Sequence, residues 1–310
     1  MKVASGFAGF QATALAQIAF SKYIILRGAA EDFIDEIVND KWDQNIFDVN
    51  AVVKFMTEPQ VGEWHAYSST QVLVADEVTV SYETMTICNA VYKAISVSDD
   101  DAALMSDVNT VFTASFVTKF WESLQRRFRC FVLSGLLQGA KFFGKNTGPS
   151  RLINLGTDGD PVVLTGDKVY TIFTAARRAF VESKRWSDRP NDMYAIITPA
   201  MQEAILNSTY FLNRNFAGSD NEGILISGEM PGKILGFRIF VTNDLPPASG
   251  GGHRIIFGHR DAFLFYRNVI RSRVVAPTDR FTHEYQALAI FDGKTIWPDA
   301  LAVAVVRVEG

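Results

Sequence analysis

Hydrophobic residues return every three or four positions over a long stretch in the first half of the chain. The series comprises Val108, Val111, Phe112, Val117, Phe120, Trp121, Leu124, Phe128, Phe131 and Val132. This spacing places the apolar side chains on one face of a helix. It predicts a helix over about residues 105–140, roughly 45 Å long, with Asp107 as its N-cap.

A different period precedes this helix. Residues 72–87 read VLVADEVTVSYETMTI, in which β-branched residues alternate with polar ones, a pattern typical of a strand. Pro59 and Gly62 interrupt the chain before it, and Trp64 and Tyr67 are aromatic residues in a polar setting. We therefore expect a long β-hairpin that projects from the body. Such a hairpin has little core of its own and needs a neighbouring surface.

The second half of the chain mixes helices and strands without regular alternation, so the predicted fold class is α+β. The stretch GKILGFRIFVTNDLP (232–246) predicts a pair of strands in which Gly236 allows a close approach or a bulge. The other expected elements are a helix over 166–186 capped by Thr165 or Asp167, a strand over 193–199 ended by Pro199, a helix over 200–207, strands over 253–259, 262–275 and 282–291, a turn at 292–293, and a C-terminal strand.

Composition indicates a chain that can bury a sizeable core. It has 310 residues, of which 48% are hydrophobic and 21% charged, and 24 are phenylalanine. Cys88 and Cys130 lie among apolar neighbours and are expected to be buried without a function, in a reducing compartment. Glutamine, threonine and serine break the apolar N-terminal run, so it predicts no secretory signal, and no run is long enough to span a membrane.

The charge balance argues against a protein that grips nucleic acid through its phosphates. The formal net charge is −4, whereas such proteins usually carry a basic excess or stripe. Two local clusters of arginine are predicted to form solvated faces or salt links between subunits; they are Arg126, Arg127 and Arg129, and Arg267, Arg271 and Arg273.

The closest approach to a catalytic motif is GAKFFGKN at 139–146. A phosphate-binding loop requires serine or threonine after the lysine and should open a helix after a strand. Here Asn146 follows the lysine, and the motif lies at the end of the long predicted helix. We interpret it as a helix C-terminus with a glycine cap and a lysine near the last carbonyls.

The sequence signals for a metal-binding site are also weak. The four histidines are His65, His253, His259 and His283, and they form no HExxH motif or zinc-type pair with cysteine. GTDGDP (156–161) resembles the start of a calcium loop but lacks the later acidic ligands, so a turn is predicted. The sequence therefore predicts no catalytic, cofactor-binding or metal-binding residue, no cofactor, and a protein that is not an enzyme.

A family resemblance rests on residues 193–265. MYAIITPAMQEAIL, a glycine-containing loop, GKILGFRIFVTNDLP and HRIIFGHRDAFLF follow one another, and the chain resembles a major capsid protein of a tailed double-stranded DNA bacteriophage with the HK97-like fold. The positions that carry this likeness are Pro199, Gly232, Gly236, Phe237, Asn243, Leu245 and Pro246.

The resemblance implies a division of the chain into named parts. They are an N-terminal arm at 1–48, an extended loop at 49–85, a P-domain at 86–174 with its spine helix at about 105–140, an A-domain at 175–280, and C-terminal P-domain strands at 281–310.

The resemblance also implies function and partners. The chain would assemble with itself into hexamers and pentamers of an icosahedral shell that encloses double-stranded DNA without sequence-specific binding, in the virion, after assembly in the host bacterial cytoplasm. A portal protein, a separate scaffolding protein and a decoration protein are the other expected partners. Some relatives cross-link a lysine of the extended loop, but residues 57–80 contain no lysine, so no such bond is expected.

Two other functions stay open at this point. An encapsulin-type compartment shell uses the same fold and would enclose enzyme cargo instead of DNA. A hydrolase without a recognisable motif is the third reading, and it would require a cleft with coupled titratable groups.

Overall fold

The structure is a computed structural model of the full chain. The residues it describes are 32–39, 50–56, 65, 82–98, 109–145, 153–183, 192–208, 233–275, 277–278 and 282–309. Most of the predicted N-terminal arm, the tip of the predicted hairpin, Asp107 and Gly232 lie outside these ranges.

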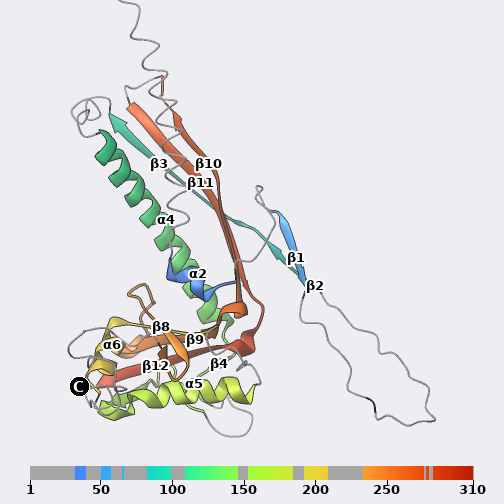
Figure 1. The fold of residues 1–310 in the computed structure, drawn as a ribbon, viewed down its shortest axis with the longest axis vertical. Coiled ribbons are helices and arrows are strands. Elements are labelled where there is room, and N and C mark those ends of the chain that lie inside the picture. Colours follow the sequence, from blue (N-terminus) through green and yellow to red (C-terminus); the bar gives the residue numbers. More distant parts are fainter. Residues whose placement is uncertain are drawn as a thin grey trace, which may run out of the picture.

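One half of the molecule is a long helix packed along a three-stranded antiparallel sheet (Figure 1). The helix is α4 (Asn109–Gly139), and its 31 residues span about 46 Å. The sheet has the order β10 (Phe263–Val275), β11 (Thr282–Thr295), β3 (Asn89–Ser98). The predicted long helix is therefore confirmed over its described residues.

The apolar stripe of α4 faces the sheet as its spacing predicts. Phe120, Trp121, Phe128 and Val132 are all at least 95% buried. Phe128 and Phe131 meet the ring of Phe291 on β11 edge-on, at centroid distances of 5.1 and 5.0 Å. These aromatic contacts fix the helix to the sheet over its second half.

Two glycines allow α4 and β11 to close around one ring. A Cβ on Gly135 of α4 or on Gly293 of β11 would lie 2.7 Å from ring atoms of Phe263. Gly139, the last residue of α4, faces Thr295 at the end of β11 so closely that a Cβ would collide with its hydroxyl. The C-terminal turn of the helix therefore lies closer to the sheet than any larger residue would permit.

The other half of the molecule is a seven-stranded mixed sheet in the order β4-β12-β9-β6-β8-β7, with β5 also on β12. Its strands are β4 (Phe142–Phe143), β5 (Val162–Thr165), β6 (Met193–Ile197), β7 (Lys233–Ile234), β8 (Phe237–Val241), β9 (His253–His259) and β12 (Leu301–Glu309). Every residue of β6 is buried, which confirms the predicted buried strand.

Two helices pack against this sheet. The predicted helix at 166–186 is a 3₁₀ turn, η2 (Gly166–Val169), followed by α5 (Tyr170–Glu182), and the Thr165 side chain makes no capping hydrogen bond. Pro199 does not end β6, which stops at Ile197; it opens α6 (Pro199–Leu206), whose N-cap Thr198 accepts from Met201 N. Three further 3₁₀ turns are η4 (Ser249–Gly251), η5 (Arg260–Ala262) and η6 (Pro298–Ala300).

The structure differs from two local predictions. Of the two predicted roles of Gly236, the bulge is absent: β7 and β8 form a tight hairpin whose two loop residues, Leu235 (φ 50°) and Gly236 (φ 92°), have the positive φ values of a type I′ turn. No turn interrupts the chain at 292–293, because β11 runs on to Thr295 with Gly293 opposite Phe265. The Asp-Gly pair is held extended because Asp292 accepts bonds from Cys88 N and Gly293 N.

A two-stranded ribbon leaves the body near the start of the chain (Figure 1). It pairs β1 (Val52–Met56) with β2 (Tyr82–Thr86) in antiparallel register, and Met56 lies opposite Tyr82 at its far end. This is the root of the predicted hairpin, whose remainder, with Trp64 and Tyr67, lies outside the described residues. A short helix, α2 (Phe33–Ile37), lies near the junction of the two halves.

Replacing Leu235 by asparagine should stabilise the chain. A positive φ costs a leucine about 1 kcal/mol, and asparagine tolerates this conformation better. We expect Leu235→Asn to raise the free energy of unfolding by up to about 1 kcal/mol in denaturant titrations of the unassembled chain. The matched control is Val241→Asn on β8, since both side chains are 38% exposed but Val241 lies in a strand. Equal losses of stability in both variants would contradict this account.

Gly135→Ala tests the closure around Phe263. Alanine favours a helix interior by about 1 kcal/mol over glycine, yet overpacking a core costs about 1–3 kcal/mol. We expect net destabilisation, because the new methyl group meets the Phe263 ring. A Phe263→Leu change should offset the effect of Gly135→Ala in a double-mutant cycle. Ser134→Ala, at an exposed position of α4, is the control and should not lower stability.

Candidate functional site

The described histidine side chains do not converge on a metal site. His253 and His259 lie at opposite ends of β9, six residues and therefore about 20 Å apart. His259 is buried, and its Nδ1 accepts from Asp261 N at 3.1 Å. His65 is exposed, and the backbone of His283 lies opposite Val97 on β3. Within the described ranges, no three His, Cys, Asp or Glu residues are grouped as metal ligands.

The two loop motifs have structural roles. In GAKFFGKN, Gly139 ends α4 and the chain enters β4, so no helix follows to bind a phosphate. We predicted a lysine near the last helical carbonyls, but the lysine side chains bind elsewhere. Lys141 pairs with Asp299, and Lys145 pairs with Asp160. The turn predicted for GTDGDP is present, with Thr157 and Asp160 bonded backbone to backbone. Asp158 and Asp160 pair with different cations, Arg254 and Lys145.

Among the described residues, Tyr194 has the most strongly shifted pKa. Burial of its side chain in β6 raises the pKa of the hydroxyl, and no charged neighbour contributes to that shift. The hydroxyl has no hydrogen-bond partner among the described residues and lies against Gly258. Functional acids and bases usually combine burial with a specific charged partner, so Tyr194 is better explained as a packed core residue.

The cysteines are exposed, contrary to their predicted burial. Cys130 lies on α4 two residues after Phe128, on a side that the sheet does not cover. Cys88 lies in the link between β2 and β3. Apolar sequence neighbours did not indicate their environment, because adjacent residues of a helix or strand point to different faces.

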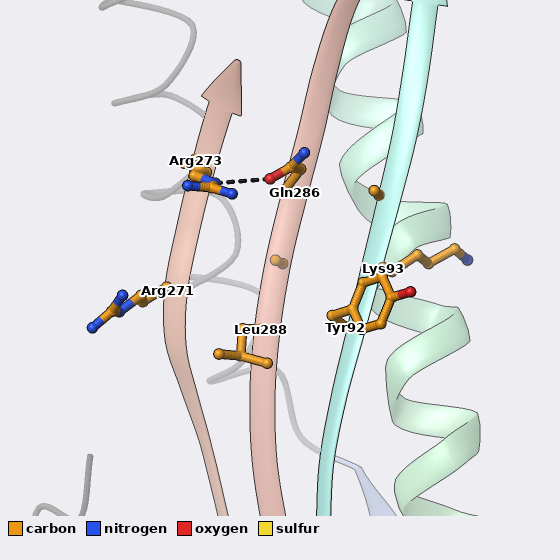
Figure 2. A pocket seen from close by; sticks show the side chains of 8 residues that line it. Tyr92, Lys93, Arg271, Arg273, Gln286 and Leu288 are labelled. Carbon is orange, nitrogen blue, oxygen red and sulfur yellow. Dashed lines mark hydrogen bonds between the residues drawn. The ribbon is translucent and has the colours of Figure 1, made fainter. Parts of the chain in front are cut away.

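The arginine clusters separate into two groups. Arg126 and Arg129 pair with Asp244, and Arg129 and Arg267 pair with Asp32 and Asp35, all within one chain. Arg271 and Arg273 instead lie on the face of the long sheet that is turned away from α4 (Figure 2). They border a hollow with a cavity volume of about 430 Å³.

The hollow is built by side chains two residues apart on three strands. Strand register places Arg271, Leu288 and Tyr92 in one row across the sheet, and Arg273, Gln286 and Ala94 in the next. Tyr92 is 82% exposed, and Arg273 Nε donates to Gln286 Oε1 at 2.7 Å. Lys93 points to the other face, where its Nζ donates to Ser123 Oγ of α4.

The chemistry of the hollow fits recognition better than catalysis. Its floor is apolar, one side carries two guanidinium groups, and no carboxylate, histidine or cysteine is among its eight lining residues. Sequence reasoning did not find this surface. A period-two alternation around Tyr92 and Arg271 was available as a signal, but the sequence did not show which strands would be neighbours.

The ribbon β1–β2 is a second uncovered surface. Val52 is 58% exposed and Tyr82 67% exposed, while Val53, Phe55 and Met85 are buried against β10 and β11. Lys294 Nζ pairs at 2.8 Å with Glu83, one residue from the far end of the ribbon, and links the ribbon to β11. Within the described residues, no helix is long and apolar enough to cross a membrane.

No protein-family model matches the chain, and no curated protein matches it either. Solved structures do. A chain from Mycobacterium phage Che8 is similar at 15% identity with a TM-score of 0.62, covering 87% of this chain and 89% of that one. The capsid of the cyanophage P-SCSP1u is similar at 14% identity and a TM-score of 0.59, covering 91% and 89%. A virus-like particle from Pyrococcus furiosus is similar at 13% identity and a TM-score of 0.51, covering 94% and 98%.

At these identities the likeness concerns the fold. It extends over nearly the whole chain and includes both halves of the molecule, with α4 along the long sheet and the mixed seven-stranded sheet beside it. The predicted α+β class and architecture are thus confirmed, and the chain has the HK97-like fold of phage capsids.

Proposed function

We propose that this chain is the major capsid protein of a tailed bacteriophage and that it assembles into the hexamers and pentamers of an icosahedral shell around double-stranded DNA. The observation that carries this proposal is the structural likeness to phage capsids over about nine-tenths of the chain. The described residues add support because they offer recognition surfaces and no convergent catalytic groups.

The proposed parts of the capsid subunit follow the predicted ranges. Residues 1–48 are the N-terminal arm, 49–85 the extended loop, 86–174 and 281–310 the P-domain, and 175–280 the A-domain. Two strand pairs cross these proposed limits. β10 falls in the range of the A-domain but pairs in the long sheet with β11, which falls in the range of the P-domain. β12 falls in the range of the P-domain but pairs with β9, which falls in the range of the A-domain.

A single copy leaves surfaces uncovered that a shell would cover. A two-stranded ribbon is marginally stable without a neighbour, and contiguous exposed apolar surface marks interaction sites. The ribbon root and the outer face of the long sheet are both of this kind, with Val52, Tyr82 and Tyr92 exposed. Contacts between copies would cover these surfaces.

The extended loop of a second copy is the occupant that best fits the hollow. Residues 57–81 contain four carboxylates and no lysine or arginine, whereas the hollow carries Arg271 and Arg273 and no carboxylate. Opposite charges at a partly desolvated contact favour this pairing and fix its register. The loop also contains Trp64 and Tyr67, large side chains suited to an apolar floor.

The remaining partners follow from the capsid role. A portal protein, a separate scaffolding protein and a decoration protein are proposed, with assembly in the host cytoplasm.

The absence of lysine at 57–80 argues for a shell held by non-covalent contacts and not by loop cross-links. A net charge of −4 suits a wall that surrounds DNA without gripping it. The protein is not proposed to be an enzyme.

An encapsulin-type compartment is the second candidate. It is favoured by the likeness to the virus-like particle from Pyrococcus furiosus, which extends over 98% of that chain. The contents of particles isolated from their natural source distinguish the two roles. Packaged double-stranded DNA supports the capsid role, and a defined protein cargo without DNA supports the compartment.

Assembly is the direct test of the proposal. The chain, produced together with its scaffolding protein, is expected to sediment as large particles, and electron microscopy should show closed shells with hexameric and pentameric units. A protein that remains a small monomer under these conditions, with no shells on the grids, would contradict the proposal.

The double variant Arg271→Glu, Arg273→Glu tests the proposed contact between copies. Both residues are exposed, so we expect the unfolding temperature of the unassembled chain to stay within a few degrees of the parent value. Particle yield, measured by sedimentation, should fall at least tenfold, because like charges would face the acidic loop. The control is Arg271→Lys, Arg273→Lys, which keeps the charge and should still assemble. Normal assembly of the glutamate variant would exclude this face as the loop site.

A further inference from the structure

Residues 32–39 lie at the junction of the two halves of the molecule and contact both. The segment contains the five-residue helix α2, flanked by Asp32 and by Val38 and Asn39 (Figure 1). Four arginines from four different elements bind it. They are Arg129 of α4, Arg238 of β8, Arg260 of η5 and Arg267 of β10.

Each carboxylate of the segment pairs with a different arginine. Asp32, whose side chain is 1% exposed, accepts from Arg129 Nε with both oxygens at 3.1 Å. Asp35 accepts from Arg267 Nη2 at 2.7 Å, and Glu36 pairs with Arg238 Nη1. Arg129 and Arg267 belong to the half with the long sheet, whereas Arg238 belongs to the seven-stranded sheet. The acidic segment therefore links the two halves electrostatically.

Backbone contacts add to these ion pairs. Arg260 donates to the carbonyl oxygens of Asp35 and Val38, at 3.1 and 3.3 Å. Asn39 exchanges two backbone hydrogen bonds with the start of β10, through Phe263 O and Phe265 N. Arg260 lies in η5, where the chain passes from β9 in one sheet to β10 in the other. One end of the segment is thus fixed at a point where the chain crosses between the halves.

The crossings themselves are bonded together as a compact hinge. The chain passes between the halves at Lys141, at η5 and at η6. Ile296 N and Trp297 N both donate to Ala262 O, and Lys141 N donates to Pro298 O. Three short crossings at one place permit a change in the angle between the halves, provided that the contacts on either side of the hinge can adjust.

The apolar side of the segment enters a core shared by both halves. Ile34, Ile37 and Val38 are fully buried in a cluster that also contains Phe128 and Phe265 from one half and Tyr194, Ile196 and Leu301 from the other. Phe33 stacks on Phe240 at 5.8 Å, and Arg129 lies over the Phe33 ring at 5.4 Å. The segment therefore packs as a wedge between the two sheets, in a core to which both halves also contribute directly.

Several features make this wedge dependent on its contacts. A five-residue helix is too short to be stable by itself, and the side chain of Asp32 makes no capping hydrogen bond. Arg267 Nη1 and the Tyr194 hydroxyl are buried without a hydrogen-bond partner among the described residues, which weakens the closed arrangement. A polar pocket of about 80 Å³ lies beneath, lined by Glu36, Tyr194, Arg238 and Arg260 among others.

We propose that residues 32–39 form a releasable electrostatic clasp that holds the long sheet with α4 and the seven-stranded sheet at one fixed angle. Closed, the clasp restricts rotation at the hinge of Lys141, η5 and η6. Released, it leaves both sheets folded and frees the angle between them. This inference concerns the single chain and does not depend on the proposed capsid role.

The test measures the distance between the halves by double electron–electron resonance. Spin labels replace Glu122 on α4 and Val181 on α5, both exposed, after Cys88 and Cys130 have been changed to serine. Labelled chains are diluted with excess unlabelled chain so that only distances within one molecule are recorded. The parent protein is expected to give one narrow distance distribution.

The clasp variant is Asp32→Asn, Asp35→Asn, Glu36→Gln. Its distance distribution is expected to at least double in width, while circular dichroism and cooperative thermal unfolding remain. The matched control is Glu83→Gln, Asp158→Asn, Asp160→Asn, which also removes three negative charges and three ion pairs, none of which joins the two halves. It should keep the narrow distribution. The single variant Glu36→Gln breaks the most exposed pair of the clasp and should give an intermediate width.

Two results would overturn the clasp. An unchanged distribution in the triple and single variants would show that other contacts fix the angle. Loss of folding in the triple variant, together with an unchanged distribution in Glu36→Gln, would make the segment an ordinary part of the core.

Discussion

The contact between α4 and the long sheet determines where most other parts of the molecule lie. It closes around Phe263, whose ring lies between Gly135 and Gly293, and continues through the edge-on stack of Phe128 and Phe131 on Phe291. Interiors pack at crystal-like density, so a helix at this separation can adopt few orientations. Because α4 ends at Gly139 and enters β4 directly, its orientation also places the edge of the seven-stranded sheet.

The elements that sequence reasoning predicted well have their signal within one segment. Spacing of three and four residues indicated α4, and an unbroken apolar run indicated β6, because those patterns depend on the element alone. The failures involve distant partners. The Asp-Gly pair at 292–293 has a strong turn signal, yet pairing with β10 and the hydrogen bonds that the Asp292 carboxylate accepts keep it extended. The sequence indicated an unusual backbone position at Gly236, but nothing in it indicated the positive φ of Leu235 in the same turn.

The candidate surface was harder to predict than the fold for the same reason. Arg271, Leu288 and Tyr92 are remote in sequence and meet only because three strands pair in one register. The arginine clusters were visible from the start, but their division into internal ion pairs and an exposed group required the structure. Asp244, in the NDLP end of the stretch at 232–246, shows this most clearly, since it pairs with Arg126 and Arg129 of α4. The family-like motif therefore contributes to the contact between the two halves.

The position of β12 bears on how the chain reaches its folded state during synthesis. β12 lies inside the seven-stranded sheet, antiparallel to β9 on one side and parallel to β4 and β5 on the other. All residues from Leu301 to Val306 are buried. A ribosome must therefore have made and released residues 301–309 before this sheet can close. Nascent chains that lack β12 leave β4 and β5 without their strand partner, so the seven-stranded sheet becomes ordered only after its last strand has been translated.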